Sequence, residues 1–528
     1  MKSGINWQIW DMVKVPITWH NIFLFFLIIT VGALPLSPFF VSVGIIGSLV
    51  AWLFIGDFKG RIAGLLQSYD VWLFLGIYLL HLAGLLYTSD FAYAFQDLKV
   101  KLPLLVLPVM LVTAGPLTYS ERKIVLIFFT AAVVISTFIS AFILLMPGRM
   151  NGEDVRQMAP FISHIRLSLM VILAIFTAFS FGLTAHRRWE RYLLFVAGAW
   201  LVVFLFLLKS FTGLILFLIC LFILVPLYQH RIPSFFWRKS IVILSIVIPF
   251  VSLIYLFGSV KRYYSIDDTD PHKIAVFTQG GRAYRHDFRA RDVENGHYVW
   301  QNVCEDELRI AWPLRSRIPY DGLDRKGNPI RFTLIRYLTS KGLPKDSLSV
   351  MQLADDEICS IENGVANYLY RNKLALYPYV YRVLWELDSY ARGNNPSGHS
   401  VAQRIIYWKA ALAIIRENIW FGVGTGDVQQ AFNDYYERNE VNLQRKFWLR
   451  AHNQYLTFMV TFGIPGFLII MTGLLFPCFR KIRYTPFLAA VFLMVSFLSM
   501  LPEDTLETQA GVTFFAFFYS FFILANLE

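Results

Sequence analysis

Apolar stretches of roughly 20 residues recur along most of the 528-residue chain, separated by short polar segments. A stretch of this length can cross the hydrocarbon core of a bilayer as a helix, so the pattern predicts about twelve membrane spans. The predicted spans are residues 21–35, 37–56, 70–87, 101–115, 122–146, 162–185, 191–208, 211–228, 239–258, 454–478, 485–501 and 510–526.

The composition agrees with this pattern. Hydrophobic residues make up 56% of the chain and charged residues only 16%, and the mean hydropathy is +0.52. These values are too apolar for a water-soluble globule. The sequence therefore predicts an all-α polytopic membrane protein.

The positions of Lys and Arg in the short loops predict its orientation, because basic loops resist translocation. Every second loop is basic, whereas the alternate loops carry acids or few charges. We therefore expect both termini on the cytoplasmic side of a bacterial inner membrane. The basic loops contain Lys2 and Lys14, Lys59 and Arg61, Arg122 and Lys123, Arg187, Arg188 and Arg191, Arg231, Arg238 and Lys239, and Arg480, Lys481 and Arg483.

This orientation divides the chain into three parts. Residues 1–258 hold the first nine helices, residues 259–453 form one large periplasmic loop, and residues 454–528 hold the last three helices. The net charge of +12 is spread over separate cytoplasmic loops, which argues against nucleic acid as a partner. The lipid bilayer is the expected partner.

The part of the loop from about 265 to 395 is polar and turn-rich, and we expect a small mixed α/β insert. Alternating runs predict strands at 297–302, 308–314 and 330–338, followed by helices over 346–372 and 379–390. Ser400 and Gln403 have the spacing of a capping box, which predicts the start of another helix in the region 397–453.

Two features of the insert leave alternatives open. Cys304 and Cys359 are its only cysteines, so they either form a disulfide or remain free thiols. Its aromatic residues either stack on sugars or form its small core. These aromatics are Trp300, Trp312, Tyr320 and Tyr337.

Three patterns after the insert can carry chemistry, and each has an ordinary structural reading. Arg404 lies one turn before Trp408 on an apolar helical stripe, where an arginine can simply reach the interface. Glycines recur at every second position from Gly422 to Gly426, a run that suits either anion binding or close helix packing. His452 lies at the outer end of the tenth span, where a histidine can accept a proton near neutral pH.

Taken together, these patterns resemble the O-antigen ligase family in order and spacing. The resemblance rests on Arg404-x-x-x-Trp408, Gly422-x-Gly424-x-Gly426, the sequence from Ala451 to Leu456, and Gly463-x-x-Gly466. It is strongest over residues 397–466. Span eight departs from the family pattern, because Lys209-Ser210-Phe211 replaces the usual Ser-Arg-Gly.

The resemblance implies transfer of a glycan from a polyprenyl diphosphate to a hydroxyl acceptor, with lipid A core as the favoured acceptor. It implies neither a nucleotide sugar, a metal nor any other cofactor. Without a metal, arginines must stabilise the departing diphosphate, because a guanidinium makes paired bonds to phosphate oxygens. Arg404 is the first candidate and Arg166 the second, while His452 would assist the acceptor hydroxyl.

Further residues are candidates for binding the diphosphate or the glycan. Asn453 orients His452 or caps the helix, and acids at Glu503, Asp504 and Glu507 either bind sugars or reflect topology alone. An O-antigen polymerase and a protein O-oligosaccharyltransferase are alternatives within the family, and a transporter or flippase is a more distant one. The remaining binding candidates are Arg450, Arg438, Lys209, Gly422, Gly424, Gly426 and Trp408.

Overall fold

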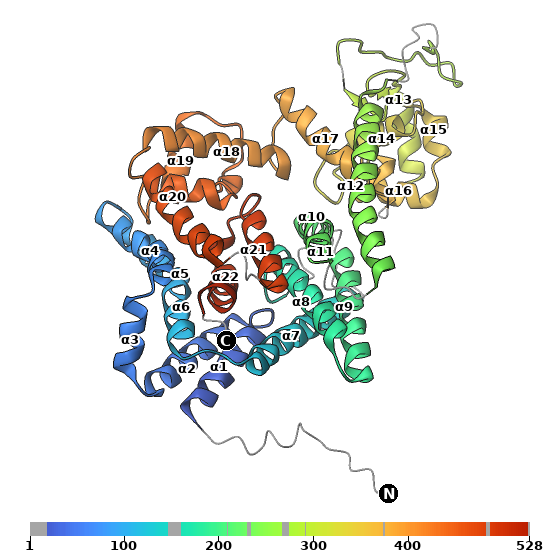
Figure 1. The fold of residues 1–528 in the computed structure, drawn as a ribbon. Coiled ribbons are helices and arrows are strands. Elements are labelled where there is room, and N and C mark those ends of the chain that lie inside the picture. The colour runs from blue at the N-terminus through green and yellow to red at the C-terminus, as the bar shows by residue number, and fades with distance from the viewer. Residues whose placement is uncertain are drawn as a thin grey trace, which may run out of the picture. The chain divides into compact units, whose positions relative to one another are not determined.

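The computed structural model is mostly helical, with 72% helix and 2% strand. Two compact units divide the chain (Figure 1): unit 1 comprises Met1–Ile246 and Gln403–Glu528, and unit 2 comprises Val247–Ala402. The structure describes residues 18–145, 160–208, 210–229, 234–266, 274–290, 292–372, 375–481 and 486–525.

Unit 1 is a bundle of helices. Two long helices, α12 (Phe235–Tyr264) and α18 (Ser400–Glu417), contain the boundaries between the units. The other helices of unit 1 are α1 (Trp19–Ala33), α2 (Pro38–Phe54), α3 (Phe58–Leu66), α4 (Tyr69–Ala83), α5 (Phe91–Lys101), α6 (Pro103–Thr113), α7 (Tyr119–Leu145), α8 (His164–Thr184), α9 (Arg188–Leu207), α10 (Phe211–Ile219), α11 (Val225–Leu227), α19 (Val428–Arg438), α20 (Gln454–Lys481), α21 (Phe487–Ser499) and α22 (Gln509–Tyr519).

Side-chain caps mark where several of these helices begin. Ser37 accepts a hydrogen bond from the amide of Phe40, with a proline at the first helical position of α2. The carboxylate of Asp90 caps α5 by accepting from the amide of Tyr93 at 2.9 Å. Each cap satisfies an amide that has no partner within its helix, which stabilises the helix by about 1 kcal/mol.

The helix α22 is apolar on all sides and lies in the interior of unit 1, beside α6 and α21 (Figure 1). Its phenylalanines form a continuous aromatic cluster with Phe492 of α21. Inside a membrane such a cluster is held by packing rather than by release of water, and each aromatic pair contributes about 0.5–1.5 kcal/mol. The cluster comprises Phe492, Phe514, Phe515, Phe518 and Phe522.

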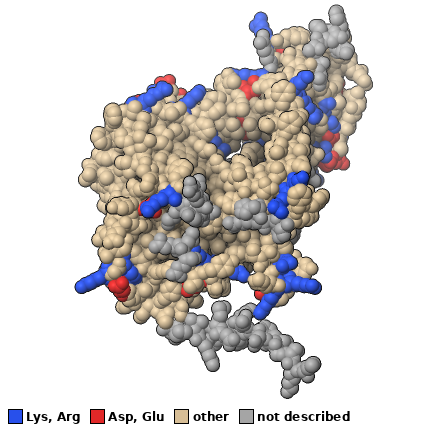
Figure 2. All heavy atoms as spheres, viewed as in Figure 1, with Lys and Arg blue, Asp and Glu red and all other residues tan. Residues whose placement is uncertain are grey.

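Each predicted span coincides with an apolar helix, but the count of twelve is not confirmed. Six helices of the described residues are long and apolar enough to cross a membrane, and a bent pair, α2 with α3, makes a seventh. The remaining apolar helices have fewer than 18 residues. Figure 2 shows that much of the face in view carries neither acidic nor basic side chains. The six are Tyr69–Leu86, Tyr119–Ile143, His164–Thr184, Arg188–Leu207, Phe235–Tyr264 and Gln454–Arg480.

Unit 2 folds around its own core, which includes Trp312, Tyr320 and Tyr337, so three of the four aromatics considered above are core residues. Trp300 packs only partly against this core. The elements of unit 2 are β1 (Val293–Glu294), β2 (His297–Tyr298), α13 (Glu305–Ala311), α14 (Ile330–Ser340), α15 (Ser347–Met351), α16 (Asp355–Glu362) and α17 (Tyr377–Ala391), besides the adjoining ends of α12 and α18.

Two of the three strands predicted in the insert are wrong. Residues 308–314 and 330–338 are helical, because Ile330, Leu334 and Leu338 repeat every four residues and all face the core. The third prediction retains only β2, which pairs with β1 across a turn at Asn295-Gly296. The predicted helices over 346–372 and 379–390 are confirmed as α15, α16 and α17.

The thiols of Cys304 and Cys359 are free, the first buried and the second exposed. The predicted helix at Ser400 is confirmed as α18. The amide of Val401 in its first turn donates to the carboxylate of Glu386 at 2.9 Å. An acidic side chain from α17 therefore caps this helix, since it accepts from an amide that has no partner within the helix.

Helices α4 and α20 pack closely against each other. A Cβ added at Gly473 would lie 2.3 Å from the carbonyl oxygen of Leu73. We expect Gly473→Ala to separate the two helices and to lower the free energy of unfolding by about 1–3 kcal/mol. Thermal unfolding of the purified protein in detergent measures this loss.

Gly76→Ala in α4 is the matched control, because its added Cβ would meet open space among the described residues. This control should unfold at or slightly above the parent temperature, since alanine is favoured over glycine in a helix by about 0.5–1 kcal/mol. Equal unfolding temperatures for the two variants would show that α4 and α20 do not need this close approach.

Candidate active site

The loop between α21 and α22 carries three acidic residues and is tied to the first turns of α20. Thr457 donates to the carboxylate of Asp504 at 2.8 Å, and the amide of Leu506 donates to the side chain of Gln454 at 2.7 Å. Gln454 in turn donates to Glu507 at 3.0 Å. These bonds fix the loop, which we call the acidic loop (residues 501–508), against the start of α20.

Arg404 of α18 and His452 meet at Glu503 of the acidic loop. A guanidinium nitrogen of Arg404 donates to one carboxylate oxygen at 3.0 Å. The other oxygen lies 3.8 Å from Nδ1 of His452, a charge-pair distance rather than a hydrogen bond. The side chains of Arg404 and His452 are about one third exposed, 32% and 35%, whereas Glu503 is only 12% exposed. The carboxylate therefore sits behind two accessible groups.

The charge on Glu503 follows from these neighbours. Burial raises the pKa of its carboxyl group, but the nearby His452 and Arg404 lower it by more, so the pKa lies below the ordinary value. Glu503 is therefore ionised at neutral pH. An ionised carboxylate at this position stabilises a protonated imidazole and holds the guanidinium in place.

The backbone of His452 adopts the left-handed region, with φ of 46°. This conformation costs a residue other than glycine about 1–2 kcal/mol and is maintained by the surroundings. Asn453 caps the next helix, because its side-chain oxygen accepts from the amides of Tyr455 and Leu456 at 3.0 and 3.1 Å. The turn thus directs the imidazole toward Tyr407, whose ring centroid is 5.7 Å away, and toward Glu503.

Arg166, in the first turn of α8, approaches the same loop from another side. Its Nη2 donates to the main-chain oxygen of Asp504 at 3.4 Å. Its Nε is buried and has no hydrogen-bond partner among the described residues. A buried guanidinium with an unused donor is costly, and an anionic ligand would satisfy it.

A second set of charges lies deeper and holds the acidic loop. Glu507 pairs with Arg450 at 3.2 Å and with Lys101 at 3.0 Å, and Lys101 also contacts the carboxylate of Asp97. Burial raises the pKa of Glu507, but Lys101 and Arg450 outweigh it, so the pKa lies below the ordinary value. Arg450 is therefore engaged in a buried ion pair rather than presented at the surface.

The glycine run lies away from these charges and packs against α20. The amides of Gly422, Gly424 and Gly426 donate to Asn418, Thr461 and Thr88 at 3.0, 3.0 and 2.8 Å. A Cβ at Gly422 would lie 2.3 Å from the carbonyl carbon and oxygen of Thr461. The amides are thus used within the protein, and the run fixes neighbouring segments instead of cradling an anion.

Arg438 and Trp408 form no contact with Glu503 among the contacts of the described residues. Arg438 forms an exposed pair with Glu417 at 3.2 Å. Trp408 is exposed on α18, one turn beyond Arg404. Lys209 lies outside the described residues.

Sequence reasoning missed the residues that hold the site together. Lys101 and Asp97 lie four residues apart at the edge of an apolar window, a spacing that would have indicated a paired charge on one helix face. Gln454 carried no signal of its own, because a glutamine at the start of a span is common. In the described residues, no three His, Cys, Asp or Glu side chains converge as metal ligands would.

Unit 1 is thus a bundle of apolar helices whose ends converge on one cluster of arginines, a histidine and acids. This arrangement is that of an integral membrane protein with a polar site at the mouth of its bundle.

Residues 368–471 match the family model described as O-antigen ligase, which covers Arg404, His452, Arg450 and the glycine run. This segment therefore resembles an O-antigen ligase domain, and the resemblance predicted from the sequence is confirmed. Members of this family are integral membrane ligases of the glycosyltransferase type that act on lipid-linked glycans. No curated protein matches the chain.

The buried pairs of Glu507 generate a stability prediction. Glu507→Gln leaves the cations of Lys101 and Arg450 without their shared carboxylate, so we expect a loss of about 3–5 kcal/mol. Thermal unfolding in detergent measures it. Glu417→Gln removes an exposed pair with Arg438 and should cost about 0–1 kcal/mol. Similar losses in both variants would refute the structural role of Glu507.

The same carboxylate predicts a dependence of stability on pH. Because the folded-state pKa of Glu507 lies below the unfolded value of about 4.3, its contribution is present above that value. The contribution is lost as the pH falls through the folded-state pKa. The unfolding temperature of the parent should therefore fall more steeply than that of Glu507→Gln on acidification below about pH 4. Parallel curves would contradict this assignment.

Proposed function

We propose that this protein transfers a glycan from a polyprenyl diphosphate to a hydroxyl group of lipid A core on the periplasmic face of the inner membrane. The observation that carries the proposal is the convergence of Arg404, His452 and Arg166 on Glu503 and Asp504 of the acidic loop. The first two residues lie within the segment that matches the O-antigen ligase model.

The arginines are suited to the leaving group. When the bond between the anomeric carbon and the diphosphate oxygen breaks, the electron pair stays on the diphosphate. Arg404 is partly exposed, and Arg166 offers a buried donor with no partner among the described residues. Both guanidiniums can make charge-assisted bonds to phosphate oxygens, so positive side chains stabilise the charge that develops there without a metal.

His452 is suited to the acceptor. Its Nδ1 side faces Glu503, which leaves Nε2 for the acceptor hydroxyl. As the acceptor oxygen bonds to the anomeric carbon, its proton passes to Nε2, and Glu503 stabilises the resulting imidazolium. Glu503 is thus a positioning residue for both His452 and Arg404.

The contacts in unit 1 support the predicted orientation. Lys101, Arg166, His452 and Glu503 all belong to ends of helices assigned to the periplasmic side, and they lie in one connected network. Contacts also join segments assigned to the cytoplasmic side, as in the pairs Arg480–Asp70 and His20–Glu121. Twelve spans with cytoplasmic termini would place the two sets of ends on opposite faces.

The decisive experiment uses purified protein in lipid with a polyprenyl-diphosphate glycan and a lipid A core acceptor in the presence of chelator. We expect the parent to form glycosylated lipid A core. Arg404→Ala should lower kcat about 10²–10³-fold through lost stabilisation of the leaving group. His452→Ala should lower it about 10²–10⁴-fold through lost proton transfer.

Two exposed residues provide matched controls. Arg416→Ala lies on α18, three turns from Arg404, and His186→Ala lies on a different loop. Both should retain parental transfer. Elongation of the donor glycan by the parent would make the protein a polymerase, and transfer that survives in His452→Ala and Arg404→Ala would remove these residues from the reaction.

A further inference from the structure

Unit 2 contains a cavity of about 200 Å³, and none of its lining residues belongs to the cluster at Glu503. Its lining comes from the hairpin of β1 and β2, from α14, and from α17 with the segment that follows it. Most of this lining precedes residue 368, where the O-antigen ligase match begins. The cavity is therefore largely a feature of the insert. Residues that line it include Asp292, Trp300, Arg336, Trp385, Asp388 and Arg392.

Two tryptophans form apolar walls of this cavity. Trp300 and Trp385 are half-buried, in contrast to Trp312, which is fully buried in the core of unit 2. The guanidinium of Arg336 lies 4.8 Å from the ring centroid of Trp385 and steadies that indole. Trp300 donates from its indole nitrogen to Asp292 at 3.2 Å. Both rings are thus oriented by polar neighbours rather than by core packing alone.

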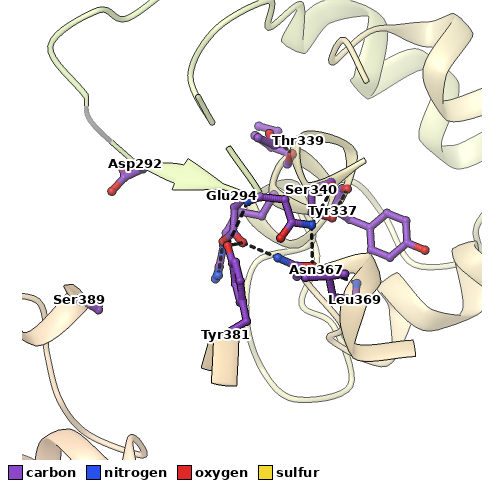
Figure 3. Close-up of polar contacts among 12 residues, drawn as sticks. Asp292, Glu294, Tyr337, Thr339, Ser340, Asn367, Leu369, Tyr381 and Ser389 are labelled. Atoms are coloured by element: carbon purple, nitrogen blue, oxygen red, sulfur yellow. Dashed lines mark hydrogen bonds and ion pairs between the residues drawn. The ribbon is translucent and has the colours of Figure 1, made fainter. Parts of the chain in front are cut away.

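The base of the cavity is a buried hydrogen-bond network around Glu294 (Figure 3). The carboxylate of Glu294 accepts from Arg336 at 2.7 Å, from Asn367 at 2.7 Å and from the hydroxyl of Tyr381 at 3.1 Å. A buried carboxylate that accepts several hydrogen bonds restrains the groups that donate to it. It holds Arg336 under Trp385, so the shape of the cavity is fixed before any ligand enters.

The rim is polar but nearly balanced in charge. Arg392 bonds to Asp388 at 2.7 Å and lies 3.7 Å from Asp292. The cavity as a whole contains three carboxylates, those of Asp292, Glu294 and Asp388, against two guanidiniums, those of Arg336 and Arg392. A site without excess positive charge does not select a phosphate. Its carboxylates and the amide of Asn394 instead suit a ligand rich in hydroxyl groups.

We propose that this cavity binds an uncharged sugar ring of the glycan. A sugar ring has an apolar C–H face that stacks on an indole and hydroxyl groups that bond to carboxylates and amides, and the cavity offers both. The assignment of this sugar ring to the glycan substrate rests on the proposed function. The space accommodates one ring rather than a chain, so the insert would recognise a single sugar of the donor or acceptor.

Binding is tested on the full-length protein in lipid nanodiscs. The probe is a set of neutral oligosaccharides released by mild acid from bacterial lipopolysaccharide, and calorimetric titration measures Kd. We expect Trp385→Ala and Trp300→Ala each to weaken binding at least about fivefold, from the loss of about 1 kcal/mol of stacking. Trp385→Phe should retain most of the affinity, because it keeps an aromatic face.

Phe288→Ala, an exposed aromatic of unit 2 outside the cavity lining, is the control and should bind as the parent does. Inorganic pyrophosphate should not compete. The proposal is overturned if none of the oligosaccharides binds, if binding is unchanged in both tryptophan variants, or if pyrophosphate displaces the sugar.

A parallel transfer assay separates this proposal from the proposed function. Trp385→Ala should raise KM with little change in kcat, while His452→Ala should lower kcat and bind the oligosaccharide normally. Binding without transfer by the parent would leave the sugar site standing and reject the ligase. Transfer that persists with no oligosaccharide binding would do the reverse.

Discussion

The buried ion pairs of Glu507 are the interaction on which the site depends. One carboxylate joins Lys101 at the end of α5, Arg450 before α20, and the acidic loop after α21. Removing three such charges from water is costly, and the arrangement is stable only because each charge has a partner. The result is a fixed platform, and Glu503 and Asp504 are carried on it at defined positions.

The fixed position of the acidic loop explains why Arg404, Arg166 and His452 can act together. Arg166 of α8 and Arg404 of α18 are 238 positions apart in the sequence, and His452 lies in the turn before α20. Arg404 and His452 both contact Glu503, and Arg166 contacts the main chain of Asp504. The acidic loop therefore positions all three side chains, those of Arg404, Arg166 and His452. A site preorganised in this way stabilises developing charge without rearranging during the reaction.

Much of the helical fold could be predicted from the sequence, and the predictions that were wrong have physical explanations. Apolar length located the helices, and the capping-box spacing at Ser400 located the start of α18. The strands predicted at 308–314 and 330–338 failed because short apolar runs fit both periods, and burial of Ile330, Leu334 and Leu338 decided for a helix. Lys101 and Glu507 could not be paired in advance, since 406 positions separate them and only the folded bundle brings them together.

The motif residues of the matched segment divide into chemical and structural groups, and the structural group makes the chemical one possible. The glycine run donates from Val423 and Gly424 to the carbonyls of Val460 and Thr461 in the second turn and beyond of α20. A side chain at Gly422 would collide with the backbone of α20 at Thr461. The run therefore helps to set the position of α20 relative to α18; α18 carries Arg404, and His452 lies in the turn directly before α20. A glycine placed to bind phosphate would leave its amide exposed, whereas the amides of Gly422, Gly424 and Gly426 are bonded within the protein and join neighbouring segments of unit 1.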